Sequence, residues 1–184
     1  MNVLHIINNL DIGGGAQTLV KDLSVKGSYN HKIISLEKSP DAFKNLKFIR
    51  FLEQPIKSLK LIYNADVIHL HLFPTLYLSP LLFFKKKVFT EHNTHNRRRN
   101  YLIFKYIDTF FYIFYRKIIC ISDGTKISLK KWILKKSFNL EVIYNGVDFA
   151  SFENSKMHFN LSKEKYYQNE QINIGMVGSF SNQK

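Results

Sequence analysis

Three consecutive glycines, Gly13, Gly14 and Gly15, follow a short apolar run at residues 3–7 and precede a segment with helical periodicity. A backbone without side chains can approach a ligand closely, and the first turn of a helix presents unpaired N–H groups that favour anions. The spacing matches neither the dinucleotide fingerprint G-x-G-x-x-G nor a P-loop. The glycines therefore predict either a tight turn or, as the interpretation we favour, contact with a phosphate-bearing ligand.

Histidines gather at the ends of two apolar runs. His69 and His71 alternate within residues 66–71, so a strand there would point both toward one face. His92 follows the run that ends at Thr90. In open α/β sheets, ligands bind outside the carboxyl ends of the strands. We therefore expect His92 to contact a ligand, whereas a structural role in the sheet is equally compatible with His69.

A metal site is not expected. Glu91 is the nearby carboxylate, and the spacing H-E-x-x-H does not occur. Cys120 is the single cysteine, which excludes a disulfide framework and a cysteine metal cluster. It lies in an apolar run, so we expect it to be buried. The sequence predicts no cofactor, and its cysteine usage fits a reducing cytoplasm.

Three arginines, Arg97, Arg98 and Arg99, follow closely behind His92. A guanidinium binds phosphate or carboxylate through two parallel hydrogen bonds. This position beside a strand end predicts contact with an anionic acceptor or a membrane surface. The lysine clusters at residues 85–87 and 130–136 are more typical of solvated surface.

The charge balance also indicates an anionic partner. The 184 residues include 27 Lys and Arg against 14 Asp and Glu, a net charge of +13. Such an excess favours a phosphate-bearing ligand, an anionic membrane or nucleic acid, although a compositional bias of the source genome would also enrich lysine. Nucleic acid is not expected, because no helix-turn-helix, RNP-like or zinc pattern is present.

The elements that would position these residues alternate along the chain. Apolar runs typical of buried strands are followed by segments with helical periodicity. This alternation predicts a parallel sheet covered on both faces, a doubly wound α/β fold. The predicted strands span residues 3–7, 32–36, 47–51, 66–71, 88–90, 118–121, 141–144 and 172–177, and the predicted helices span residues 16–26, 56–63, 74–84, 100–115 and 123–136, the last capped by Ser122 or Asp123.

The longest apolar stretch, residues 101–115, is interrupted by Lys105 and Asp108. It does not reach the ~18 uninterrupted apolar residues of a membrane span. We expect a helix packed into the core, with a membrane-surface role for its flank as the alternative. The predicted location is the cytoplasm, with the inner membrane face as an alternative.

The domain organisation follows from one change in composition. Residues 1–153 are predicted to form a Rossmann-like domain. Residues 154–171 are polar and without period, which indicates a linker or loop. Residues 172–184 then hold one strand, predicted to be the first strand of a second domain whose remainder is missing.

Five segments, in this order and at these spacings, resemble the retaining glycosyltransferases of family 4, which have the two-domain GT-B fold. The segments are residues 4–17, 66–71, 88–93, 118–122 and 142–152. The second of them is the string DVIHLH, the third is VFTEHN, and the fifth begins with VIYNGVD.

The resemblance implies that this N-terminal domain lies on the acceptor side and that a C-terminal domain binds a nucleotide-sugar. The sugar, a hexose, would be transferred with retention of its anomeric configuration and without a metal. Gly14 and Gly15 would approach the donor diphosphate, and His92 would contact the donor sugar. Lys184 stands where the family has a diphosphate-binding lysine, but Ser179 replaces the family's arginine after the strand.

The expected function is therefore sugar transfer to a glycan or lipid-linked acceptor, in cell-surface polysaccharide synthesis. We expect the 184 residues to be inactive alone, because a GT-B enzyme works in the cleft between two domains. The alternatives are a non-catalytic module that binds an acceptor or a membrane, and half of a split transferase that needs a partner chain. An unpaired strand at residues 172–177 would also permit a dimer.

Overall fold

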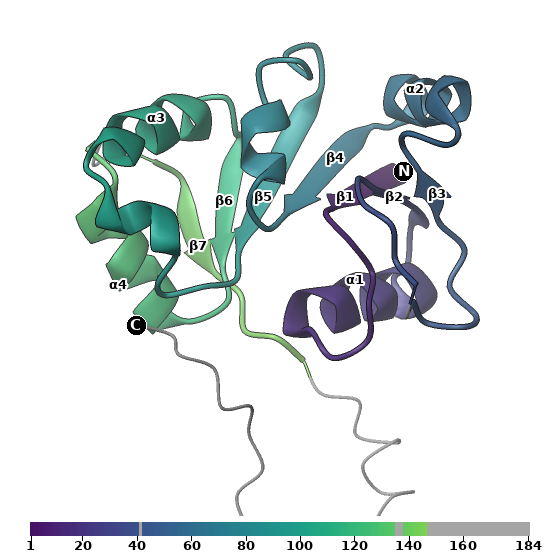
Figure 1. The fold of residues 1–184 in the computed structure, drawn as a ribbon, viewed down its shortest axis with the longest axis horizontal. Helices are drawn as coiled ribbons and strands as arrows, with labels where there is room; N and C mark the ends of the chain where they lie inside the picture. Colours follow the sequence, from purple (N-terminus) through teal and green to yellow (C-terminus); the bar gives the residue numbers. More distant parts are fainter. Residues whose placement is uncertain (41, 135–137, 147–184) are drawn as a thin grey trace, which may run out of the picture. The chain divides into compact units, whose positions relative to one another are not determined.

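The computed structural model describes residues 1–40, 42–134 and 138–146 (Figure 1). Met1–Asn145 form one compact unit. The predicted linker at residues 154–171, the predicted strand at residues 172–177 and Lys184 lie outside the described residues, so those predictions are untested.

Seven strands and four α-helices alternate along the described residues of this unit, with two short 3-10 helices. The strands are β1 (Asn2–Ile7), β2 (Asn30–Ser35), β3 (Ile49–Arg50), β4 (Val67–His71), β5 (Lys86–Glu91), β6 (Lys117–Cys120) and β7 (Leu140–Val142). The helices are α1 (Gly15–Lys26), α2 (Pro55–Asn64), η1 (Thr75–Leu78), η2 (Arg97–Asn100), α3 (Ile103–Tyr112) and α4 (Asp123–Trp132).

All seven strands are parallel and follow the order β3-β2-β1-β4-β5-β6-β7. The chain builds outward from β1 in one direction and from β4 in the other, so the topological switch point lies between these two strands. The predicted doubly wound α/β fold is confirmed. Because every strand is parallel, all carboxyl ends meet at one edge of the sheet.

The apolar core lies in two layers on opposite faces of the sheet. Successive residues of a strand point to opposite faces. Ile6 therefore belongs to one cluster, with Ile62 of α2, Tyr112 of α3 and Leu129 of α4, whereas Ile7 belongs to the other, with Val20 of α1. Figure 1 shows α3 and α4 beside β6 and β7, and α2 above β3 at the other end of the sheet. Cys120 is buried as expected.

The start of α4 follows from its sequence. The Ser122 hydroxyl accepts a hydrogen bond from the backbone N–H of Thr125 at 3.1 Å, and Asp123 lies in the first turn. Both features stabilise the positive end of the helix dipole. Of the two predicted caps, Ser122 is the one that the structure uses.

Two predicted helices are wrong in extent. Residues 74–84 form only η1 and a series of turns, because Pro80 has no N–H with which to continue a helix. The helix predicted at residues 100–115 is shorter in the structure: α3 begins at Ile103 and ends at Tyr112, and extended backbone at Tyr101 separates it from η2. None of the helices in the described part of the chain is long and apolar enough to cross a membrane.

Candidate functional site

A cavity of about 240 Å³ opens at the carboxyl ends of the strands, next to the switch point. Its walls come from the turn after β1 and the start of α1, and from the segments that follow β4, β5, β6 and β7. The structure therefore brings Gly14, Gly15 and His92, which are far apart in sequence, to one place. The residues that line the cavity are Gly14, Gly15, Ala16, Gln17, Leu72, His92, Asn93, Ile121 and Asn145.

The glycine turn is built for close approach from this cavity. Gly13 has a φ of +109°, a conformation that residues with side chains rarely adopt. Gly14 caps α1, and a Cβ there would lie 1.9 Å from Oε1 of Gln17. A Cβ on Gly15 would meet nothing within 4 Å. The first turn of α1 lines the cavity, and its N–H groups have no partner within the helix, which suits an anion.

His92 stands at the end of a chain of imidazoles that crosses the sheet. Its Nε2 lies 3.4 Å from Nδ1 of His71. Nε2 of His71 lies 3.0 Å from Nδ1 of His5, and Nε2 of His5 lies 2.9 Å from Nδ1 of His31. A neutral imidazole has one N–H, so these hydrogen bonds require the rings to share one direction of donation.

These imidazoles are neutral near pH 7. Burial lowers the pKa of His5 to about 3, helped by the charge of His31, and burial lowers the pKa of His92 to about 4. The pKa of His71 is held well below its usual value, first by burial and then by the neighbouring histidines. His92 therefore offers the cavity an uncharged ring that can donate or accept a hydrogen bond.

Sequence reasoning found His92, His69 and His71 but missed His5. In the parallel register, His5 lies opposite His69 on the neighbouring strand. The signal was present as a polar residue inside an apolar run, but its partners depend on strand order, which the local pattern does not contain.

Three of these histidines could hold a metal ion. Ligand nitrogens of His5, His69 and His71 all lie within 4.8 Å of one another. His69 also bonds Oγ1 of Thr90 through Nε2 at 2.7 Å. The group contains no carboxylate, and hydrogen bonds already engage both ring nitrogens of His5 and of His71.

The three arginines have separate environments. Arg97 is exposed. Arg98 is buried: its Nε donates to Oδ2 of Asp108 at 2.8 Å, and its guanidinium lies 4.7 Å from the centre of the Phe73 ring. Arg99 donates from Nη1 to the Thr94 carbonyl at 2.9 Å. None of the three lines the cavity. The predicted acceptor contact stays a prediction, and Arg97 has the accessible guanidinium for it.

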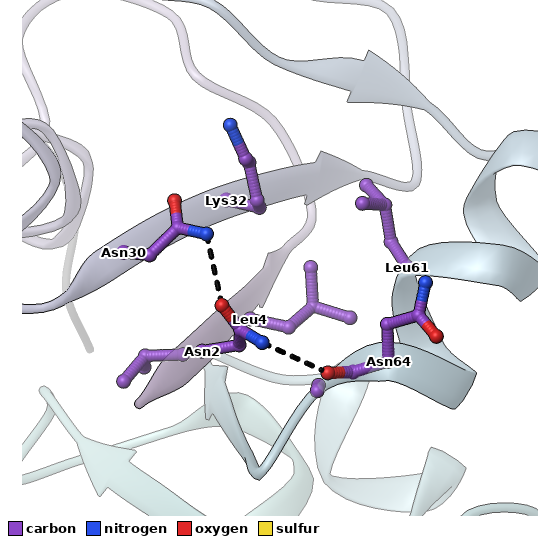
Figure 2. A pocket seen from close by; sticks show the side chains of 8 residues that line it. Asn2, Leu4, Asn30, Lys32, Leu61 and Asn64 are labelled. Carbon is purple, nitrogen blue, oxygen red and sulfur yellow. Dashed lines mark hydrogen bonds between the residues drawn. The ribbon is translucent and has the colours of Figure 1, made fainter.

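A second cavity, of about 200 Å³, lies at the opposite edge of the sheet, where β1 and β2 begin (Figure 2). There the Asn2 side chain accepts from Nδ2 of Asn30 at 2.9 Å and donates to the carbonyl of Asn64 at 3.4 Å. These bonds join β1 to β2 and to the end of α2. We interpret this cavity as part of the scaffold.

The strand order, the switch point and the glycine turn after β1 define a Rossmann-like α/β domain. Residues 14–151 match the model of Glycosyltransferase Family 4, so the chain belongs to glycosyltransferase family 4. No curated protein matches the sequence.

A solved structure has a similar fold. It is HepE (Alr3699) from Anabaena, crystallised in complex with UDP and glucose. The TM-score is 0.64 at 14% sequence identity, over 88% of this chain and 50% of HepE. This chain therefore spans about half the length of that structure.

Proposed function

We propose that this chain forms the acceptor-side half of a retaining glycosyltransferase. The enzyme would move a hexose from a nucleotide-sugar to a glycan or lipid-linked acceptor in cell-surface polysaccharide synthesis. The observation that carries the proposal is the cavity shared by Gly14, Gly15 and His92, in a chain that belongs to family 4. The UDP in the HepE crystal makes UDP-sugars the first donors to test.

The proposed chemistry depends on charge that develops on the leaving diphosphate. The first N–H groups of α1 and the partial positive charge of its N-terminus would stabilise that charge. In the proposal this stabilisation replaces a metal ion. The uncharged ring of His92 would hydrogen-bond a hydroxyl of the donor sugar and orient the sugar for transfer. Arg97 is proposed to contact an anionic acceptor.

Replacement of Gly15 by leucine tests the donor site. Open space lies where its Cβ would be, and Gly15 lines the cavity. The Gly15→Leu side chain would therefore fill the donor site without straining the fold. We expect UDP binding, measured by calorimetric titration, to weaken by about tenfold or more.

The matched control is Gly124→Ala, at the start of α4. A Cβ there makes only ordinary contacts at 3.7 Å, and Gly124 does not line the cavity. It should bind UDP as the unchanged chain does. Equal UDP affinity of the unchanged chain and Gly15→Leu would contradict the donor site.

An assay of sugar transfer tests whether a second domain is needed, as proposed. The 184-residue chain alone is expected to release no glucose from UDP-glucose, with or without a glycan acceptor, because the proposed reaction takes place in a cleft that a second, donor-binding domain completes. Measurable turnover by this chain alone would overturn the claim that a second domain is required. If a partner chain supplies that half, a pull-down with this chain should recover it and the mixture should transfer sugar.

A further inference from the structure

The helix α3 carries its apolar residues on the outside. Its inward side buries Asp108, Thr109 and Tyr112. Its outward side, with the residue before the helix and the residue after it, exposes five large apolar side chains. They are Leu102, Ile103, Tyr106, Phe110 and Ile113, between 52% and 75% exposed. A surface helix normally shows the opposite arrangement.

The apolar surface continues beyond α3 on the same side of the sheet. Leu81 and Phe83 are exposed in the turn after η1, and Ile56 and Tyr63 are exposed on α2. Side chains connect the three segments. Ser79 bonds the carbonyl of Phe111 at 3.2 Å, and Nζ of Lys85 bonds the carbonyl of Tyr63. We call the exposed apolar residues of α2, this turn and α3 the outer apolar face.

The sequence predicted a core helix at residues 100–115, and the structure gives a physical reason for the difference. Asp108 points inward because three donors meet it there. Arg98 Nε and Trp132 Nε1 each lie 2.8 Å from its Oδ2, and the Tyr77 hydroxyl lies 2.7 Å from its Oδ1. This network turns the polar side of α3 into the protein and leaves the apolar side without cover from the described residues.

The charges around this face have one sign. Residues 55–64, 79–86 and 101–116 contain six basic side chains and one acidic side chain. The acidic residue is Asp108, which is fully buried and paired with Arg98. The basic residues are Lys57, Lys60, Lys85, Lys86, Lys105 and Arg116. The outward charge of these segments is therefore entirely positive.

We propose that the outer apolar face docks on an anionic lipid bilayer. Large exposed apolar patches mark interaction surfaces. Phenylalanine and tyrosine rings enter the boundary between headgroups and acyl chains, while lysines reach from an apolar surface to lipid phosphates. A second copy would bring like charges together, whereas an anionic bilayer complements both the rings and the lysines.

The docked orientation would also serve the proposed reaction. η2 and the start of α3 follow the carboxyl end of β5, so the face begins near the edge of the sheet that holds the cavity. Arg97, the first residue of η2, is exposed. This consequence rests on the proposed function, but the docking itself does not.

Vesicle sedimentation tests the docking. The chain is mixed with vesicles of phosphatidylcholine alone, or of phosphatidylcholine with phosphatidylglycerol. We expect binding that requires phosphatidylglycerol and weakens with salt. Replacing both Tyr106 and Phe110 by serine should weaken binding by about tenfold or more. Both residues are more than half exposed, so the fold should persist, which circular dichroism checks.

The control pair is Val25→Ser with Tyr29→Ser. These residues are also exposed and also four apart, but Val25 belongs to α1, on the other side of the sheet. The control pair should bind vesicles as the unchanged chain does. Two results would overturn the proposal: equal vesicle binding by both pairs, or no vesicle binding together with a dimer that the Tyr106 and Phe110 changes dissociate. The UDP affinity of Gly15→Leu tests the proposed donor site separately, so neither vesicle result bears on that site.

Discussion

Asp108→Asn is expected to lower the free energy of unfolding by about 3–5 kcal/mol, because it leaves the buried Arg98 guanidinium without its counter-charge. Asp108 is fully buried and ion-pairs with Arg98 at 2.8 Å. Trp132 and Tyr77 also donate to the same carboxylate. Urea unfolding followed by circular dichroism measures the change.

Two variants make this test specific. Asp22→Asn removes a carboxylate whose ion pair with Lys21, at 3.4 Å, is about a third exposed to solvent. Because exposed ion pairs contribute little, this change should alter the free energy of unfolding only slightly. Arg98→Met combined with Asp108→Asn removes both buried charges and should recover part of the loss. If Asp108→Asn and Asp22→Asn cost the same, the buried ion pair does not organise this side of the fold.

Mild acid is expected to unfold the chain. The folded state holds His5, His69 and His71 neutral, since burial lowers their pKa values. The unfolded chain binds protons below about pH 6.5. The contribution of these neutral imidazoles to the free energy of unfolding is therefore complete above that pH. It is lost as the pH falls toward the folded-state pKa of each group, which is about 3 for His5. Three such groups give a slope of about 4 kcal/mol per pH unit below about pH 6.

Urea unfolding at a series of pH values between 7 and 4 measures this slope. His5→Gln removes one buried imidazole and should flatten the slope by about 1.4 kcal/mol per pH unit. His95→Gln is the control, because His95 is exposed. A free energy of unfolding that stays constant or rises on acidification would show that these histidines are not buried neutral.

The sequence predicted the sheet well because its strands are continuous apolar runs. Parallel strands that are buried on both faces leave such runs, and the glycine turn and the strand-end histidine then fall at the carboxyl edge by topology alone. That is why Gly14, Gly15 and His92, which are far apart in the chain, line one cavity. The shared donor site itself was expected only from the resemblance to family 4.

The rest depends on contacts that a local pattern does not contain. The register between β1 and β4 pairs His5 with His69, and only the strand order reveals it. The break at Tyr101 lets Arg98 meet Asp108, which turns an arginine predicted to face an acceptor into a buried ion pair. The same pair decides which side of α3 faces outward, so the outer apolar face could not be predicted from the apolar pattern of residues 101–115.

The most direct test of the proposed donor site is to map where a UDP-sugar binds. A ¹⁵N-labelled chain is titrated with UDP-glucose, and the amide shifts are followed by NMR, which detects weak binding. The largest shifts are expected at Gly14, Gly15, Asn93 and Asn145, around the cavity at the carboxyl ends of the strands. Shifts centred on Asn2 and Asn30 at the opposite edge, or no shifts at saturating UDP-glucose, would contradict the proposed donor site.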